Sequence, residues 1–271
     1  IGCGASAIGP AIAGYLLDAG GKRLRPALTA LGALAVGFEG PVVRLMCVGE
    51  LLHLGSLLHD DVVDDGDMRR GRAAAHRVYG APVTVLTGDF CLARSVLLAA
   101  EEGGHAAVTA LGATVTEMAE GEVLQLRHAG NLLTSMEQYM EVVDRKSAAL
   151  IAWCAAAAAF AKGDMVAAEA LQRFGRGVGR AFQITDDVLD YCDGTGKNPG
   201  VDLLERKVTL PLIVAMARVN GLHAELNAGP PTPQRLPRLM RQVRESGALE
   251  ASLEAARSYA DDAMSALDIL P

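Results

Sequence analysis

Apolar residues recur every three to four positions along almost the whole chain, and no stretch shows the alternation of period two that is typical of a strand. Because residues with this spacing share one face of a helix, the pattern predicts an all-α protein without a hairpin. No composition shift or short repeat marks a boundary, so we expect a single all-α domain over 1–271. The predicted helices are 27–36, 42–59, 83–100, 106–127, 135–161, 166–190, 209–219 and 249–267.

Glycine, proline and hydroxyl residues mark the ends of several predicted helices. Gly20-Gly21 is expected to end the first helix, Pro82 to begin another, and Thr134 or Ser135 to cap a third. The segment 194–204 holds three glycines and one proline, and it is the clearest candidate for a functional loop.

A group of closely spaced glycines, Gly175, Gly177 and Gly179, lies inside a predicted helix. A nucleotide-binding loop needs a preceding strand and the spacing G-x-G-x-x-G, and both are missing from this sequence. We therefore expect these glycines to allow a close approach between two helices.

Composition narrows the class of protein further. Half of the 271 residues are hydrophobic, which permits a large core, and the net charge of −7 argues against nucleic acid as a partner. The longest apolar run, 148–161, is shorter than the roughly 20 residues of a membrane span, so it is expected to be a buried helix. The five cysteines form no C-x-x-C pair and no signal peptide is recognisable, so we expect a soluble, cytoplasmic protein.

Two aspartate clusters carry the clearest chemical signal. The sequence DDVVD spans Asp60–Asp64, and DDVLD spans Asp186–Asp190. In a helix the first and last aspartate of each cluster lie one above the other, and their like charges need compensation. Mg²⁺ prefers carboxylate oxygens and commonly binds substrate phosphates at the same time. The clusters therefore predict a magnesium-dependent site for phosphorylated substrates.

Basic residues accompany these clusters. The loop GKRLRP at 21–26 precedes a predicted helix, the pair Arg69-Arg70 follows the first cluster, and the isolated lysines are Lys146, Lys197 and Lys207. Arginine and lysine bind the phosphate oxygens that metal ions leave exposed, so two basic groups suggest two diphosphates. The residues before Asp60 are apolar, which suits a hydrocarbon tail. An isoprenoid diphosphate has this combination of head and tail.

Four segments, in order from about residue 20 to 211, resemble the trans-isoprenyl diphosphate synthases, the polyprenyl synthetase family. They are GGKRLRP, ELLHLGSLLHDDVVDDGDMRRG, DRKSAAL and FQITDDVLDYCDGTGKNPGVDLLERKVTLPL. The resemblance implies the isoprenoid synthase fold, a helical bundle around a deep apolar cavity. It also implies a homodimer formed through central helices that include parts of 83–127.

The resemblance also implies a role for individual residues. Asp60, Asp64 and Asp186 are expected to bind about three Mg²⁺ ions per active site, as hard cations prefer carboxylates, with Asp61, Asp187 and Asp190 in support. The expected ligands of the allylic diphosphate are Arg69, Lys146 and Lys207, with Lys197 nearby. Those of isopentenyl diphosphate are Lys22, Arg25, His53 and Arg70. Gln183 is expected on the face of Asp186, with its amide oxygen near substrate or cation, and Ser147 replaces the threonine usual in the family while keeping the hydroxyl.

The implied reaction is ionisation, condensation and elimination. The allylic C–O bond breaks, the double bond of isopentenyl diphosphate attacks the resulting cation, and a proton is lost, most plausibly to the released pyrophosphate. Asp60, Asp64, Asp186, Lys146, Gln183 and Lys207 are the residues expected to support catalysis. The protein contributes positioning, charge stabilisation and exclusion of water.

Product length is expected to depend on the residues one turn before Asp60. Short-chain family members carry bulky aromatic residues there, whereas this chain has Gly55 and Ser56, with Leu52 one turn further. Because these residues lie below the first cluster on one helix, they predict an open cavity and a product of about six to ten isoprene units. Geranylgeranyl or farnesyl diphosphate is the shorter alternative. Such a product suggests transient membrane contact during release.

Other functions fit the sequence less well. A class I terpene cyclase shares the fold and the first motif, but its second motif typically mixes Asn or Asp, Ser or Thr, and Glu. A non-catalytic subunit of a heteromeric synthase tends to lose aspartates that are all present here, although a catalytic subunit that needs a partner stays open. A ferritin-like di-metal bundle requires Glu-x-x-His pairs, and we recognise none at the positions that such a site needs.

Overall fold

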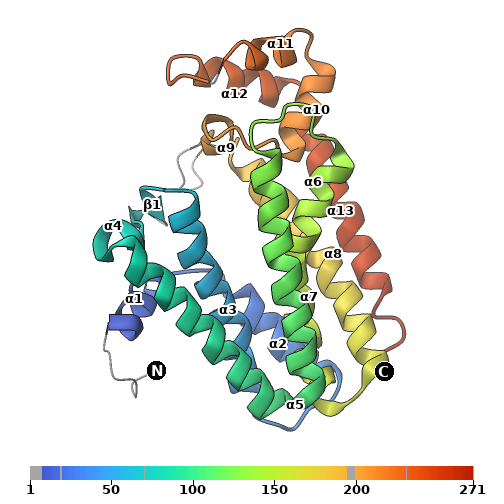
Figure 1. Ribbon diagram of the computed structural model, residues 1–271. Coiled ribbons are helices and arrows are strands. Elements are labelled where there is room, and N and C mark those ends of the chain that lie inside the picture. The colour runs from blue at the N-terminus through green and yellow to red at the C-terminus, as the bar shows by residue number, and fades with distance from the viewer. Residues whose placement is uncertain (1–7, 19, 70, 194–198, 230, 271) are drawn as a thin grey trace. The chain divides into compact units, whose positions relative to one another are not determined.

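The structure, a computed structural model, describes residues 8–18, 20–69, 71–193, 199–229 and 231–270, and within them helices dominate (Figure 1). The prediction of an all-α protein is confirmed. The helices are α1 Ile8–Leu17, α2 Leu24–Ala35, α3 Val42–Val63, α4 Ala75–Tyr79, α5 Ala81–His128, α6 Met136–Val142, the π-helix η1 Val143–Ala148, α7 Ala149–Lys162, α8 Met165–Leu189, α9 Val201–Leu204, α10 Leu210–Arg218, α11 Leu222–Asn227, α12 Leu236–Glu245 and α13 Ala248–Ser265.

The chain divides into two compact units. Unit 1 comprises Ile1–Ala113, Trp153–Leu171 and Leu270–Pro271, and unit 2 comprises Thr114–Ala152 and Gln172–Ile269. Helices α5, α7 and α8 each contribute residues to both units. A single domain over 1–271 stays a prediction.

Unit 1 is built around α3, whose neighbours approach closely at small residues. A Cβ atom on Gly49 of α3 would lie 2.3 Å from Cys154 Sγ of α7, and one on Gly55 would lie 2.9 Å from the Gly88 oxygen of α5. Contacts this short leave no space for a side chain, so the glycines set the separation of the helices. Leu45 and Val48 of α3 are fully buried among these helices.

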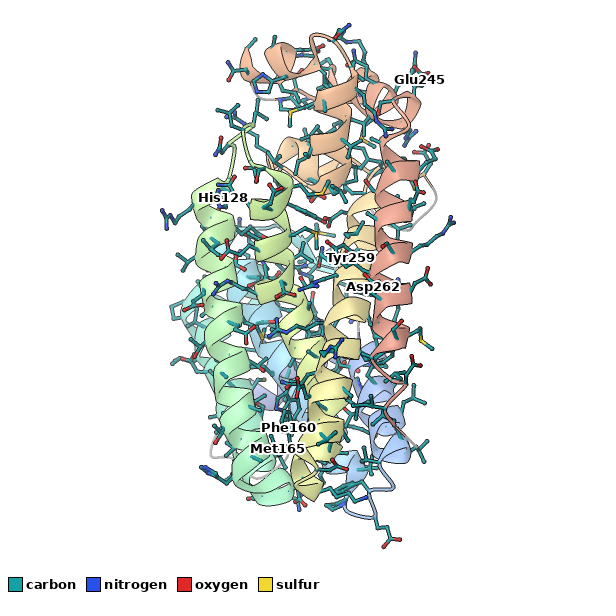
Figure 2. The ribbon with its side chains drawn as sticks, turned by 90° about the vertical axis from the view of Figure 1, so that its right-hand side faces the viewer. His128, Phe160, Met165, Glu245, Tyr259 and Asp262 are labelled. Atoms are coloured by element: carbon teal, nitrogen blue, oxygen red, sulfur yellow. The ribbon has the colours of Figure 1, made fainter. Side chains whose placement is uncertain are left out.

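Helix α5 is interrupted where the sequence predicted a break between two helices. Gly104 has φ 66° and ψ −163°, a conformation that is not helical. Three residues later, the Ala107 oxygen accepts a hydrogen bond of 3.1 Å from the indole nitrogen of Trp153, a fully buried residue of α7. Figure 2 shows Phe160 and Met165 at the turn that follows, between α7 and α8.

Unit 2 is built around α8, and its three glycines lie where helices cross. A Cβ atom would lie 2.5 Å from Ala152 Cα at Gly175, 2.6 Å from Ala263 Cβ at Gly177, and 2.6 Å from Ala148 Cα at Gly179. The expectation of close helix contact is confirmed. Figure 2 shows Tyr259 and Asp262 on α13, the helix that contacts Gly177.

Replacing Gly175 by Ala is expected to lower the free energy of unfolding by about 1–3 kcal/mol, because the new methyl group would overlap the α7 backbone. The measurement is chemical denaturation. The matched control is Gly112→Ala, because a Cβ there would meet nothing within 4 Å. This control is expected to be neutral or stabilising by about 0.5–1 kcal/mol, as alanine is the better helix former. Equal effects at the two positions would contradict the packing argument.

Some elements were not predicted. Met68–Arg69 (β1) and Arg72–Ala73 (β2) form a two-stranded antiparallel pair, so the expectation of no hairpin was wrong. The helices α4, α9, α11 and α12 are short and were also missed, whereas Ser135 caps α6 with a capping box as proposed. By length and composition alone, α3 and α5 could each cross a membrane, but core helices of other proteins pass the same test.

Candidate functional site

The first aspartate cluster lies at the C-terminal end of α3. The Asp64 backbone amide donates a hydrogen bond of 2.8 Å to the backbone carbonyl oxygen of Asp60, so these two residues lie on consecutive turns as predicted. Asp64 is exposed and Asp60 is half-buried, whereas Asp61 is 1% exposed. Two of the three carboxylates are therefore available at the surface of unit 1, and the third points inward.

Asp61 is held by Arg69 from the strand that follows the cluster. Both Nε and Nη2 of Arg69 lie 2.6 Å from Asp61 Oδ1. The second oxygen, Oδ2, is buried and has no hydrogen-bond partner among the described residues. Arg69 therefore already compensates one aspartate of the cluster. The neighbouring Arg70 lies outside the described residues.

A second arginine holds the loop after the cluster, and the sequence analysis missed it. Arg77 of α4 donates to the Asp65 backbone oxygen at 2.8 Å and contacts the carboxylates of Asp65 and Asp67, each at 2.9 Å. Asp65 has φ 49°, in the left-handed region. An aspartate-rich segment followed by Arg-x-x-x-His-Arg was the available signal, but only the fold shows which arginine turns back.

Three of the four predicted ligands of isopentenyl diphosphate, Lys22, Arg25 and His53, lie just before α2, on α2 and on α3 in unit 1. A Cβ atom on Gly49 would lie 3.8 Å from Arg25 Cβ, which places Arg25 beside α3, one turn before His53. Lys22 is exposed in the loop before α2, and Arg23 in the same loop forms an ion pair with Glu50 of α3. The structure therefore brings Arg25 to the stretch of α3 that carries His53.

The three positions assigned to chain length have different environments. Leu52 is 4% exposed, and Ser56 is half-buried with its hydroxyl donating to the His53 oxygen at 2.9 Å. Gly55 is buried, and a Cβ there would also lie 3.3 Å from Cys91 Cβ of α5. Gly55 therefore faces α5 at a close helix crossing, whereas Ser56 already carries a half-buried side chain.

The second aspartate cluster lies at the end of α8 in unit 2. Asp187 and Asp190 are 6% and 8% exposed, and Asp190 accepts backbone N–H bonds of 3.2 Å from Val201 and Asp202. Burial raises the pKa of Asp187 to about 7, hydrogen bonds from Tyr139 and Gln183 oppose this shift, and the charges of Asp186 and Asp190 add to it. Burial and the charges of Asp187 and Asp190 also raise the pKa of Asp202.

The predicted lysines of unit 2 lie beside carboxylates. Lys146 forms an ion pair with Glu122 of α5, and Lys207 Nζ lies 2.7 Å from Glu205 Oε2. The Lys207 amide also donates to the backbone oxygen of Asp202 at 2.8 Å. The charge of Lys207 partly opposes the rise in the pKa of Asp202. Lys197 lies outside the described residues, as does much of the loop predicted at 194–204.

Ser147 and Gln183 form part of a hydrogen-bonded chain that leads to the second cluster. The Ser147 hydroxyl donates to Gln183 Oε1 at 2.7 Å, and Gln183 Nε2 donates to Asp187 Oδ1 at 2.8 Å. The Tyr139 hydroxyl donates to the other Asp187 oxygen, Oδ2, at 2.6 Å. The amide oxygen of Gln183, which was expected near substrate or cation, thus accepts a hydrogen bond from Ser147 in the structure.

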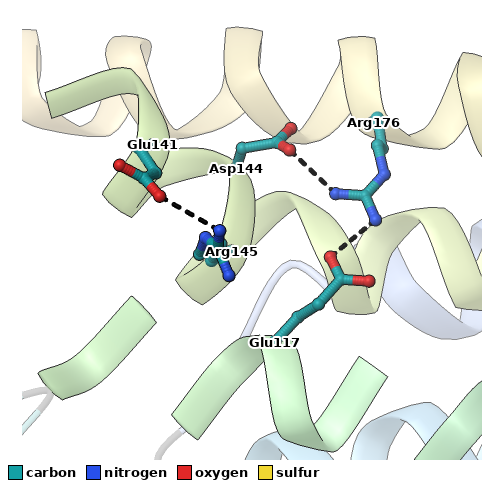
Figure 3. A pocket seen from close by; sticks show the side chains of 5 residues that line it. All are labelled: Glu117, Glu141, Asp144, Arg145 and Arg176. Atoms are coloured by element: carbon teal, nitrogen blue, oxygen red, sulfur yellow. Dashed lines mark hydrogen bonds and ion pairs between the residues drawn. The ribbon is translucent and has the colours of Figure 1, made fainter. Parts of the chain in front are cut away.

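Lys146 and Ser147 belong to the π-helix η1, a form that is frequent at functional sites. Asp144 and Arg145, which precede them in η1, take part in ion pairs around a pocket of about 320 Å³ (Figure 3). Arg176 of α8 binds Asp144 at 2.9 Å and Glu117 at 2.6 Å, and Arg145 binds Glu141 at 3.0 Å. These charges connect η1 to its neighbours within unit 2.

The donor set of both clusters fits a hard divalent cation. Buried Asp61 keeps one carboxylate oxygen without a hydrogen-bond partner in the described residues, and the acids around Asp187 raise one another's pKa. Both observations mark negative charge that the protein itself compensates incompletely. Among the described residues, no three His, Cys, Asp or Glu side chains form a ready-made cage.

Known proteins resemble this chain over most of its length. The family model for polyprenyl synthetase matches residues 8–235. Octaprenyl diphosphate synthase of Haemophilus influenzae is 40% identical over 268 residues, covering 95% of this chain and 81% of the relative. A crystal structure of a polyprenyl synthase from Caulobacter crescentus CB15, in complex with calcium and isoprenyl diphosphate, superimposes with a TM-score of 0.94 at 40% identity, covering 99% of this chain and 85% of that one.

A decaprenyl diphosphate synthase from Rhodobacter capsulatus gives a TM-score of 0.89 at 38% identity, covering 97% of this chain and 84% of that one. The fold thus defines a protein of the all-α isoprenoid synthase class. The chain belongs to the polyprenyl synthetase family and is a prenyltransferase that makes a polyprenyl diphosphate.

Proposed function

We propose that this enzyme uses Mg²⁺ and extends an allylic diphosphate with isopentenyl diphosphate to about six to ten isoprene units. The observation that carries the proposed length is the small, half-buried Ser56 on the turn of α3 below Asp60. Relatives that are 35–40% identical are named as octaprenyl, nonaprenyl and heptaprenyl synthases, which supports a long product.

The proposed cation ligands are Asp60, Asp64 and Asp186, for about three Mg²⁺ ions, since Mg²⁺ is usually held by one or two carboxylates together with substrate phosphates. When bound, the cations would stabilise the charge of the leaving pyrophosphate. Asp61, Asp187 and Asp190 would support the ligands, and Arg69 is available to both Asp61 and a diphosphate.

The remaining polar residues would bind the two substrates. Lys146 and Lys207 are proposed for the allylic diphosphate, and Lys22, Arg25 and His53 for isopentenyl diphosphate. Arg70 and Lys197 keep the roles implied by the resemblance. Lysine and arginine hold phosphate oxygens in place. Buried apolar residues such as Leu52 and Leu58 of α3 would keep water away from the allylic carbocation.

The experiment is incubation of the purified chain with Mg²⁺, farnesyl diphosphate and isopentenyl diphosphate, followed by mass spectrometry of the products. A ladder ending at about eight isoprene units is expected, because the position below Asp60 is small. A product that stops at about three or four units would overturn the proposed length. Absence of turnover without a second subunit would instead contradict the proposal that this chain acts without a partner subunit.

The cation is expected to stabilise the folded protein more at about pH 7.5 than at about pH 5. Burial raises the pKa of Asp187 from 3.8 to about 7, so between these values the folded state binds more protons than the unfolded chain. When a chelator has removed Mg²⁺, the free energy of unfolding should therefore fall as the pH rises through this range. Added Mg²⁺ should restore the free energy of unfolding at the higher pH. Thermal unfolding with and without Mg²⁺ measures this, and equal stabilisation at both values would contradict it.

A homodimer is proposed through the first half of α5. Val83, Leu86, Phe90 and Leu97 are 37–67% exposed and spaced by three, four and seven positions, so they share one apolar face. An apolar face of this kind marks a protein interface. Light scattering measures the mass, and a monomer at micromolar concentration would contradict the proposal. A cytoplasmic location and transient membrane contact during release complete the proposal.

A further inference from the structure

We propose that Tyr139 is a positioning residue, which acts through Asp187 and Gln183 to hold the second aspartate cluster in register with the segment that carries Lys146 and Ser147. This inference rests on the proposed role of Asp186 as a cation ligand. Tyr139 lies 48 residues before Asp187 in the chain, and it is not among the residues that the sequence analysis assigned to the site.

The first argument is that Asp187 has one donor for each carboxylate oxygen. Tyr139 donates to Oδ2 at 2.6 Å, and Gln183 donates to Oδ1 at 2.8 Å. Both donors are uncharged, and Asp187 is 6% exposed. Loss of the tyrosine hydroxyl would leave a buried carboxylate oxygen unpaired, which favours a rotated carboxyl group.

The second argument is that the tyrosine ring itself is fixed. Tyr139 is 6% exposed and packs in a core cluster with Val143, Ile184 and Leu210. Its amide donates to the Ser135 oxygen at 3.0 Å, and the Ser135–Gln138 capping box fixes the start of α6. Burial and the charge of Asp187 raise the pKa of Tyr139 well above its ordinary value, so the hydroxyl stays protonated and donates.

The third argument is that two clamps join the same pair of helices. Gln183 and Asp187 are one turn apart on α8, and they bind Ser147 of η1 and Tyr139 of α6, the helix that runs directly into η1. Tyr139 and Ser147 together therefore fix how η1 lies along α8. Asp186, next to Asp187, and Lys146, next to Ser147, are placed by this arrangement.

The test is Tyr139→Phe, which keeps the ring and removes the hydroxyl. We expect the Mg²⁺ concentration for half-maximal rate to rise at least about fivefold and kcat to fall about tenfold, the usual effect of losing a hydrogen bond to a charged group. The KM for isopentenyl diphosphate should change less than about twofold, because its proposed ligands lie in unit 1. Tyr259→Phe of α13, in the same unit, is the matched control and should leave all three values unchanged.

A merely structural role predicts a different result. Tyr139→Phe would then lower the unfolding temperature and the yield of active enzyme, while the Mg²⁺ midpoint of the remaining enzyme stayed at the wild-type value. That result would overturn the proposal. In an Asp187→Ala background the further effect of Tyr139→Phe should be under about twofold, since residues of one network are not additive. If the effects of Tyr139→Phe and Asp187→Ala instead multiply in the double variant, the proposal is overturned as well.

The wild-type enzyme separates this inference from the proposed function. A wild type whose turnover does not depend on Mg²⁺ contradicts the proposed function and, with it, the inference. A Mg²⁺-dependent wild type together with an unchanged midpoint in Tyr139→Phe contradicts the inference alone.

Discussion

Replacing Asp60 by Asn is expected to lower kcat by about a thousandfold, because the amide removes a charge that the proposed site needs to hold a cation against the developing pyrophosphate. Asp60 is half-buried at the end of α3 and one turn from Asp64, so Asn fits the same space. The measurement is steady-state turnover with saturating substrates and Mg²⁺, alongside circular dichroism to verify the fold.

The same substitution at Asp261 is the control. Asp261 is an exposed aspartate of α13 in unit 2, and Asp261→Asn is expected to keep wild-type turnover. If Asp60→Asn retained more than about a tenth of the activity, Asp60 would not be a cation ligand of the proposed kind.

Replacing Ser56 by Phe is expected to shorten the product to about four isoprene units or fewer, because position 56 lies about one helical turn, roughly 6 Å, below Asp60. Ser56 is half-buried, and its only described side-chain bond is to the His53 oxygen on its own helix. The substitution therefore breaks no described side-chain hydrogen bond to another helix. Mass spectrometry of the products gives the chain length directly.

Ser56→Ala separates bulk from the loss of the hydroxyl. It removes the bond to the His53 oxygen without adding volume, and it should leave the product distribution unchanged. An unchanged product in Ser56→Phe would mean that the hydrocarbon tail follows another path, whereas shortening in Ser56→Ala would implicate the hydroxyl.

The sequence predicted the start of α3 and most of α8 and α13, whereas α3 continues four residues beyond its predicted end. The spacing of apolar residues and the residues that end a helix are local features of the sequence. The bounds predicted for α3, α8 and α13 therefore differ from the structure by only a few residues. The two aspartate clusters were visible for the same reason, since the stacking of Asp60 and Asp64 depends only on the helix between them.

Contacts between distant segments could not be predicted. The bonds of Asp187 to Tyr139 and of Arg69 to Asp61 depend on which elements pack together, and no local pattern distinguishes Tyr139 from another buried tyrosine. The short helices α9, α11 and α12 were missed because their four to ten residues carry too little periodicity. The β1–β2 pair is shorter still, and two residues a strand show no alternation.

The crossing of α3 and α5 at Gly55 and Gly88 limits how this enzyme can evolve. Any side chain at position 55 would meet the Gly88 backbone oxygen at 2.9 Å and must move a helix backbone, whereas Ser56 already carries a half-buried side chain that bonds within its own helix. Of the two positions below Asp60, only Ser56 is open to a single-step change of product. Lineages that share this crossing should therefore vary in product length through position 56 while both glycines stay fixed.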